Sequence, residues 1–304
     1  MTAEHGRHGW VVIDKPSGIT SSNVVVRLRR SAGIKAGHAG TLDPLATGVL
    51  PVALGEATKT VSFVSKATKL YRFRVQWGID TDTDDREGKT VAESPVRPDA
   101  AAITSALARF TGSVLQRPPA YSAIKIAGRR AYALARAGEA PRLAERRVTI
   151  SELRLVSHLD RDHAEFEAVV GEGTYIRSLA RDLAQALGTC GHVTALRRLA
   201  VGRFTETQGI SLDLATSLGH SLLASGHVLP IEAALDDIPA LTLTADEAAR
   251  LRHGQPIVLT ECEGARLDRL DDGTIVGARH GQLLVGLARI ENGRLQPVRI
   301  INER

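Results

Sequence analysis

The chain is poor in cysteine, which excludes several classes of protein at once. Its 304 residues include two cysteines, Cys190 and Cys262. They stand far apart and match neither a disulfide framework nor a Cys-x-x-Cys zinc motif, so both are expected to be reduced thiols. The ten histidines lack ligand spacings such as His-Glu-x-x-His. We therefore expect no structural or catalytic metal.

Long apolar runs are also missing. No stretch approaches the roughly 20 residues that a membrane helix needs, and the first ten residues lack the apolar core of a secretory signal. Hydrophobic residues make up 43% of the chain, which is typical of a globular protein. The sequence predicts a cytoplasmic protein without membrane contact, folded as one large domain or two unequal ones.

The chain has 34 acidic residues against 39 lysines and arginines, and the excess of basic residues lies in one segment. The segment 117–147 holds eight basic residues and two acidic ones, a net charge of +6 against +5 for the whole chain. The basic residues are Arg117, Lys125, Arg129, Arg130, Arg136, Arg142, Arg146 and Arg147. Such a run fits a solvated helix face, or an arm that lies on the phosphates of a nucleic acid.

Local patterns predict a mixed order of strands and helices. Apolar or alternating stretches favour strands, and caps with apolar periodicity favour helices; Thr20, Ser21 and Ser22 are candidate N-caps for the first helix. The expected strands are Trp10–Asp14, Val49–Leu54, Lys69–Trp77, Val148–Val156 and Ala164–Val170. The expected helices are Val24–Leu28, Glu56–Ser65, Asp99–Phe110, Arg130–Ala137 and Tyr175–Leu187. This order predicts an α/β (α+β) domain built around one sheet.

The last part of the chain is short and rich in strand signals. A boundary near residues 235–239 would separate a larger domain, 1–237, from a second one, 238–304. Asp272-Gly273 and Asn292-Gly293 are tight-turn signals, and the second lies between two alternating stretches. We expect a small β-barrel module here, of a size common for appended binding domains.

The densest motif is Gly-His-Ala-Gly-Thr-Leu-Asp-Pro-Leu-Ala-Thr-Gly at residues 37–48. Its glycines permit unusual backbone conformations, and Pro44 stiffens the turn that carries Asp43. A carboxylate held on a pre-set loop suits a nucleophile. Alternatively, Asp43 caps or tightens a turn.

Five segments, in order, resemble the TruB family of tRNA pseudouridine synthases over about residues 10–204. The loop at 37–48 resembles the family's active-site motif. The others are Ile13-Asp14-Lys15-Pro16-Ser17-Gly18, Lys69-Leu70-Tyr71, Gly173-Thr174-Tyr175-Ile176-Arg177, and Gly191-His192-Val193-Thr194-Ala195-Leu196-Arg197-Arg198-Leu199. The resemblance implies a catalytic domain with a mixed, largely antiparallel sheet flanked by helices, followed by a small PUA-like RNA-binding domain.

The resemblance also implies an activity and a set of site residues. The enzyme would isomerise the uridine at position 55, in the T loop of tRNA, without a cofactor. Asp43 would be the nucleophile, and Arg177 would pair with it, favour its ionised form and fix its rotamer. Tyr71 would stack on the target base, and its hydroxyl is a candidate general base. Tyr175 and Leu196 would line the pocket; from periodicity alone, both also fit ordinary core positions.

Substrate contacts outside the pocket follow from the same resemblance. The target nucleotide must be flipped out of its stack, and His38 would fill the space it leaves. Lys15 of the N-terminal motif is expected to contact substrate. The 117–147 segment, with Arg129 and Arg130, matches the family's thumb insertion that closes over RNA.

Other functions remain open at this point. An RNA-folding chaperone would use the charge and the β module but not Asp43. A pseudouridine synthase acting on another RNA, or with a guide RNA, would share the motif, although the basic arm favours a stand-alone enzyme. A glycoside hydrolase needs two catalytic carboxylates, and Asp43 has no acidic partner within its motif. The covalent route is open between attack at C6, attack at C1′ and a glycal path. We expect a monomer that needs no protein partner.

Overall fold

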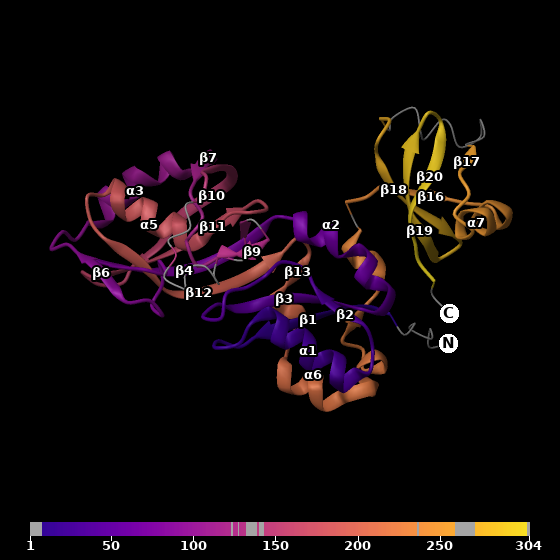
Figure 1. Cartoon of the computed structure of the whole chain (residues 1–304), viewed down its shortest axis with the longest axis horizontal. Helices are drawn as coiled ribbons and strands as arrows, with labels where there is room; N and C mark the ends of the chain where they lie inside the picture. The colour runs from indigo at the N-terminus through magenta and orange to yellow at the C-terminus, as the bar shows by residue number, and fades with distance from the viewer. Residues whose placement is uncertain are drawn as a thin grey trace.

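The structure, a computed structural model, describes residues 8–122, 124–126, 128–131, 139, 143–235, 237–258 and 271–302. Most of the chain surrounds an eleven-stranded sheet, and a separate five-stranded sheet follows near the C-terminus (Figure 1). No helix in these ranges is long and apolar enough to cross a membrane.

The large sheet is mixed and largely antiparallel. Its main path runs β14-β1-β3-β12-β4-β11-β10-β7, and only the β1–β14 and β3–β12 pairs are parallel. The path strands are β1 (Gly9–Lys15), β3 (Thr47–Leu54), β4 (Lys69–Trp77), β7 (Gly112–Gln116), β10 (Arg146–His158), β11 (His163–Val170), β12 (Gly191–Val201) and β14 (Gly209–Ser211). Off this path lie β2 (Ala36–His38), β13 (Phe204–Thr205) and β15 (Val228–Leu229). The predicted fold class is confirmed.

Side-chain alternation along β4 decides which face of the sheet is buried. Tyr71, Phe73, Val75 and Trp77 all lie in the core, as expected from their spacing of two residues. The intervening arginines face the other side, where Arg72 pairs with Glu167 of β11 across the strands. A shift of one residue in register would expose the aromatic row, so burial specifies the pairing.

Helices cover the buried face in two groups. The helix α3 (Ala100–Leu107) packs against β10 and α5 (Ile176–Ala186) against β12 and β4, while α1 (Ser21–Ala32) packs on α6 (Leu212–Leu218) near β1 (Figure 1). At the start of α1, Thr20 Oγ1 accepts a hydrogen bond from the Asn23 amide at 3.1 Å, which confirms its predicted role as N-cap.

Three local predictions differ from the structure. Residues 55–66 form a 3-10 turn, Gly55–Thr60, before the short helix α2 (Val61–Lys66), because the Thr58 and Thr60 hydroxyls bond to carbonyls three residues back. The predicted loop 37–48 begins instead in strand β2. In the predicted helix 130–137, Arg130 belongs to the hairpin β8 (Lys125–Ile126) and β9 (Arg129–Arg130), and residues 132–137 lie outside the described ones.

The C-terminal sheet has the order β16-β18-β19-β20-β17. Its elements are β16 (Ala240–Thr242), α7 (Ala245–Arg252), β17 (Ile257–Val258), β18 (Ile275–His280), β19 (Leu283–Glu291) and β20 (Arg294–Ile300). Asn292 and Gly293 join β19 to β20 with φ values of +52° and +70°, as the Asn-Gly signal predicted.

The two sheets are joined by a shared core. Leu284, Leu287 and Ile301 pack in one apolar cluster with Trp10 and Ile231 of the larger unit. Beside this cluster, the ammonium of Lys59 donates a hydrogen bond of 2.7 Å to the carbonyl of Ile300. Apolar packing and this hydrogen bond therefore hold the C-terminal sheet against the large one.

Candidate active site

The loop that carries Asp43 is anchored at several points along its backbone. The Asp43 carbonyl accepts from the Ala46 amide at 3.1 Å, and the Pro44 carbonyl accepts from the Gly18 amide at 2.8 Å. On the other side, Ser21 of α1 bonds to both the amide and the carbonyl of Leu42. Because the backbone is held on both sides of it, Asp43 presents its carboxylate, 31% exposed, in a defined direction.

Arg177, in the first turn of α5, clasps this carboxylate. Its Nε donates to Asp43 Oδ2 at 2.9 Å, while Nη1 and Nη2 donate to the carbonyls of Thr83 and Tyr121 at 2.8 and 2.9 Å. The guanidinium is 4% exposed. A planar arginine fork with donors in several directions can make these bonds together, which a lysine ammonium cannot match in geometry. The predicted pairing of Asp43 with Arg177 is present in the structure.

A second carboxylate, which sequence reasoning missed, also contacts Arg177. Asp85 Oδ2 lies 3.3 Å from Arg177 Nη1, and its side chain is 5% exposed. The Thr83 hydroxyl and the Glu87 amide both donate to Asp85 Oδ1. The turn-rich acidic segment 81–88 was visible in the sequence, but nothing local distinguished Asp85 from its neighbours Asp82 and Asp84.

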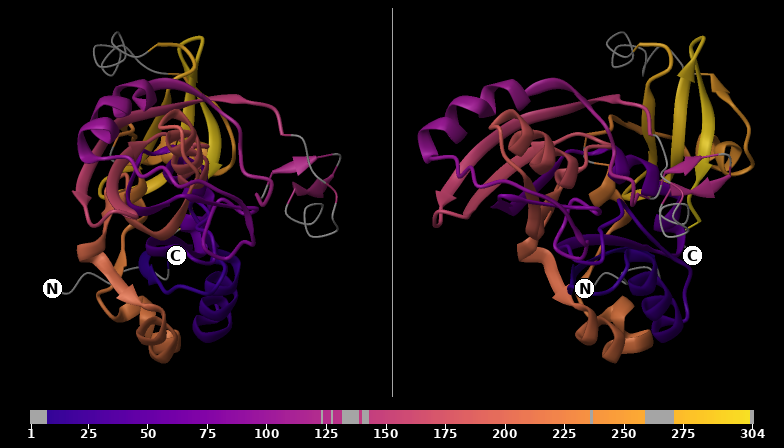
Figure 2. Two further views of the ribbon diagram at one scale, coloured as in Figure 1. Left: turned by 90° about the vertical axis from the view of Figure 1, so that its left-hand side faces the viewer. Right: turned by 60° about the vertical axis from the view of Figure 1, so that its left-hand side comes forward.

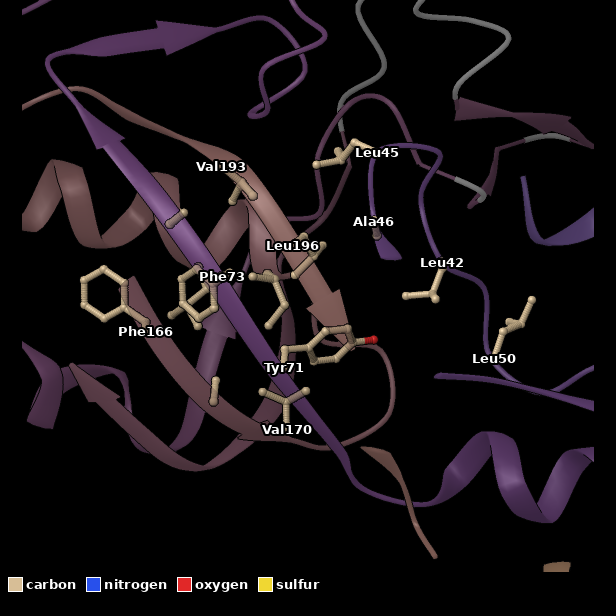
Figure 3. Packing of buried hydrophobic residues seen from close by; sticks show 14 of the residues in the cluster. Leu42, Leu45, Ala46, Leu50, Tyr71, Phe73, Phe166, Val170, Val193 and Leu196 are labelled. Carbon is tan, nitrogen blue, oxygen red and sulfur yellow. The ribbon is translucent and has the colours of Figure 1, made fainter. Parts of the chain in front are cut away.

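Tyr71 and Leu196 reach the same region from adjacent strands. Tyr71 is 8% exposed at the inner end of the aromatic row on β4, and Leu196 lies beside it on β12. Figure 3 shows the Tyr71 ring between Leu196 and Val170, with its hydroxyl directed toward the side where Leu42 lies. Both predicted pocket residues therefore stand at the edge of the core, next to the Asp43 loop.

Tyr175 is held in place by Gln116 of β7. The Gln116 amide group donates to the Tyr175 carbonyl at 3.0 Å, and its oxygen accepts from the Tyr175 amide at 2.8 Å. The guanidinium of Arg146 lies over the Tyr175 ring, 5.2 Å from its centroid. From the sequence, Arg146 was expected only as part of the basic arm, and its place beside the pocket comes from the structure.

A pocket of about 400 Å³ opens where these elements meet. Asp43, Tyr71, Tyr175 and Leu196 line it together, but Arg177 stands behind Asp43 and does not. The other described lining residues are Gly40, Thr41, Leu42, Ser65, Lys69, Ile124, Arg146, Val170, Gly171, Glu172, Gly173, Thr174, Ile176 and Arg198. The lining combines apolar side chains with a few polar and charged groups, as ligand sites commonly do.

Two further basic groups of the pocket were missed. Arg198 on β12 is buried and hydrogen-bonded to the Asp43 loop. Lys69 at the start of β4 is buried and donates to the Ser65 carbonyl at 2.5 Å. Burial, with a smaller effect of the nearby Arg198 charge, lowers the pKa of Lys69 to about 8. Both residues stand in motifs that the sequence displayed, but no local signal separated them from structural positions.

Lys15 is buried next to the loop that carries Asp43. It is fully buried, and its ammonium donates to the carbonyls of Pro16, Ile19 and Pro44 at 2.8, 2.8 and 3.2 Å. Burial lowers its pKa to about 8. The amine is not among the described groups that line the pocket, and its contact with substrate stays a prediction. Lys15 ties its own turn to the loop that carries Asp43.

The remaining predicted residues are not among those that line the pocket. His38 on β2 is half-buried, its Nδ1 has no hydrogen-bond partner among the described residues, and burial lowers its pKa. Arg129 is exposed on the β8–β9 hairpin and pairs with Glu139 at 3.1 Å. The hairpin stands out from the body of the molecule (Figure 2), but the side chain of Arg130 lies outside the described part. The structure brings neither His38 nor Arg129 into the pocket lining.

Comparison with known proteins places this chain in a family. Three family models match successive parts of the chain. The TruB family pseudouridylate synthase N-terminal domain matches residues 27–176, the tRNA pseudouridylate synthase B C-terminal domain 177–236, and the pseudouridine synthase II TruB C-terminal model 239–301.

Curated relatives match over nearly the whole length. Proteins named tRNA pseudouridine synthase B include one from Rhodospirillum rubrum, 55% identical over 97% of this chain and 96% of the relative. One from Caulobacter sp. (strain K31) is 50% identical over 96% and 95%. Among solved structures, a Cbf5-Nop10-Gar1 complex contains a chain with a TM-score of 0.75 and 24% identity, over 99% of this chain and 87% of that one, which supports the fold.

These matches define the class of protein, a pseudouridine synthase, which is an isomerase. Within that class, the chain belongs to the TruB family.

Proposed function

We propose that this enzyme converts the uridine at position 55, in the T loop of tRNA, to pseudouridine. The observation that carries the proposal is the ion pair between Arg177 and Asp43 at the edge of a pocket lined by Tyr71. The relatives named tRNA pseudouridine synthase B supply the substrate class.

The reaction rearranges bonds without net addition of atoms. The N1–C1′ bond breaks, the base turns over, and a C5–C1′ bond forms; C5 loses its proton and N1 gains one. No oxidant, hydrolytic water or group donor is consumed, so the proposal requires no cofactor. What the protein must supply is a nucleophile, a proton acceptor and a pocket that retains the detached base.

In this proposal Asp43 is the nucleophile and Arg177 its positioning partner. Arg177 holds the carboxylate at the edge of the pocket through its Nε, while its other donors bond to backbone carbonyls. The same carboxylate serves attack at C6, attack at C1′ or a glycal path. Tyr71 stacks on the base and offers its hydroxyl for proton transfer, and Leu196 and Tyr175 limit the movement of the ring.

Access to the pocket requires that the nucleotide leave its stack, at a cost of a few kcal/mol. We infer that His38 fills the space left in the RNA. The arm at 117–147, with Arg129 and Arg130, would lie on phosphates, and the C-terminal sheet, as a PUA-like domain spanning 238–304, would add RNA contacts. The proposed enzyme acts in the cytoplasm as a monomer, without a protein partner.

The test is tritium release from a T-arm stem-loop RNA labelled at C5 of uridine. C5 loses its hydrogen only when it bonds to the sugar, so one equivalent released per RNA would report the reaction directly. A labelled stem-loop whose target uridine is replaced by cytidine serves as the control and should release nothing. Tight binding without release would instead favour another RNA substrate or an RNA-folding chaperone.

A further inference from the structure

Arg198 is the most buried arginine beside the pocket, at 1% exposure. Its Nε donates to the Val49 carbonyl at 2.7 Å and Nη2 to the Gly40 carbonyl at 3.1 Å. Val49 lies in the buried run of β3, and Gly40 lies three residues before Asp43. One guanidinium therefore joins β12 to both ends of the loop that carries the nucleophile.

The third contact of Arg198 is with the hydroxyl of Tyr71, the candidate general base. Its Nη1 lies 3.4 Å from the Tyr71 hydroxyl, on the neighbouring strand at the paired position of the ladder. A guanidinium has donors only, so the phenol oxygen must accept and the phenol proton must point elsewhere. Catalytic hydrogen bonds are often long before substrate binds.

The charge of Arg198 has no carboxylate partner within ion-pair distance in the part of the chain that the structure describes. Arg177, by contrast, has Asp43 at 2.9 Å and Asp85 at 3.3 Å. Burial of a cation whose hydrogen-bond partners are carbonyls and a phenol is costly. A neutral donor such as a glutamine would hold one loop carbonyl with less penalty. The positive charge therefore calls for a role beyond loop anchoring.

We propose that Arg198 is a positioning residue of the isomerase reaction, which acts through the Tyr71 hydroxyl. It holds the phenol oxygen at a set distance from the Asp43 loop, directs the phenol proton into the pocket, and stabilises electron density on that oxygen during proton exchange. This role rests on the proposed function of Tyr71 and extends it to the buried cation.

The experiment is a double-mutant cycle of Arg198→Gln and Tyr71→Phe, measured as single-turnover tritium release from the T-arm stem-loop. In the wild-type background, Arg198→Gln should slow release by about a hundredfold, with the RNA dissociation constant changed less than about threefold. In the Tyr71→Phe background, the same substitution should change the rate less than about threefold, because the group through which it acts is gone.

The neighbouring residue offers a matched control. Arg197 lies on the same strand and pairs with Asp14 and Glu206 on the exposed face. Arg197→Gln should leave the rate within about threefold of wild type, since surface ion pairs contribute little. Arg198→Lys, which keeps the charge but not the three-way geometry, should recover part of the loss, and it is the variant to use if Arg198→Gln does not fold.

The outcomes distinguish failure of the role proposed for Arg198 from failure of the proposed isomerase function. Equal losses from Arg198→Gln with and without the Tyr71 hydroxyl would assign Arg198 to loop anchoring alone and overturn the proposal. So would a rate for Arg198→Gln equal to that of Arg197→Gln. Absence of release by the wild-type enzyme would instead overturn the proposed substrate.

Discussion

The Nε of Arg177 lies 2.9 Å from Oδ2 of Asp43, although 134 positions separate the two residues in the chain. The arginine comes from α5, on the covered side of the sheet, and the aspartate from a loop between β2 and β3. The loop of Asp43 leads into β3, and α5 leads into β12. The two residues therefore meet only when β3 and β12 pair in the sheet, where β12 lies between β3 and β4.

Replacement of Asp43 by Asn should remove the nucleophile while keeping the fold. We expect unchanged RNA affinity and a fall in tritium release of at least about a thousandfold, equivalent to about 4 kcal/mol of barrier. Asp14→Asn, which alters an exposed carboxylate on β1, is the control and should stay near wild type. Activity of Asp43→Asn within about tenfold of wild type would remove Asp43 from the role of nucleophile.

Arg177→Lys keeps the charge but loses the fork that reaches Asp43, Thr83 and Tyr121 together. Buried carbonyls would lose their donors, so the free energy of unfolding should fall by about 2 kcal/mol. The loose carboxylate should slow release by at least about a hundredfold.

Arg181→Lys is the matched control for that variant, on the same helix one turn later. Arg181 forms its ion pairs with Asp84 and Asp182 rather than with Asp43. Arg181→Lys should lose stability but keep its rate within about threefold of wild type, because its substitution leaves the Arg177 clasp in place. Urea denaturation measures the stability of the two variants, and tritium release measures their rates. Equal rate losses in the two variants would contradict a specific role for Arg177.

The basic arm should account for much of the salt dependence of RNA binding. Alanine at Arg129, Arg130, Arg146 and Arg147 should weaken binding and flatten the slope of log affinity against log salt, by about one for each phosphate that is no longer neutralised. Filter binding between low and physiological salt measures the slope. An unchanged slope would place the arm outside the interface.

Four arginines on the exposed sheet face provide a control of equal charge. Each is already paired with a carboxylate, and none belongs to the arm. They are Arg72, Arg74, Arg154 and Arg197. Their replacement by alanine should change the salt slope less than the arm variant does, because none of the four belongs to the arm that we expect to neutralise phosphates.

Lys69 should leave a signature in the dependence of stability on pH. Burial lowers the pKa of Lys69 in the folded protein to about 8, from an ordinary value of 10.5. The unfolded chain then binds more protons between these values, so the free energy of unfolding should rise with pH across this window.

Lys69→Met removes that dependence. Relative to wild type, the variant should gain most below pH 8, by at most about 3 kcal/mol, and the gain should shrink toward pH 10. Urea denaturation at pH 7 and pH 10 measures it, with the exposed Lys66→Met as control. Parallel stability curves for wild type and Lys69→Met would show that the folded state does not disfavour the ammonium.

Gly48 and Gly18 test how closely the Asp43 loop approaches β12. Both have positive φ, +96° and +86°, so alanine strains either position. A Cβ at Gly48 would lie 2.2 Å from the Arg198 carbonyl oxygen, whereas one at Gly18 would meet nothing within 4 Å. Gly48→Ala should therefore cost about 2 kcal/mol more than Gly18→Ala. Thermal denaturation checks this, and equal costs would mean that the loop can move away from the strand.

Much of the local structure could be predicted from the sequence because its causes are local. The alternation on β4 determined which side of the strand is buried, and Thr20 marked the start of α1. The turn at Asn292-Gly293 needed only the tolerance of those residues for positive φ. The motif around Asp43 was equally visible, because glycine and proline restrict or free the backbone wherever they stand.

The sequence by itself thus determined the chemical groups of the candidate site: Asp43, Arg177 and Tyr71 are recognisable by type and motif. Only the tertiary structure decided which charges face one another. Arg177 pairs with Asp85 rather than with Asp82, Arg198 contacts the Tyr71 hydroxyl, and Lys15 is buried against backbone carbonyls. The physical reason is distance along the chain. Burial and ion pairing depend on strands brought together across many residues, and no local pattern encodes that approach.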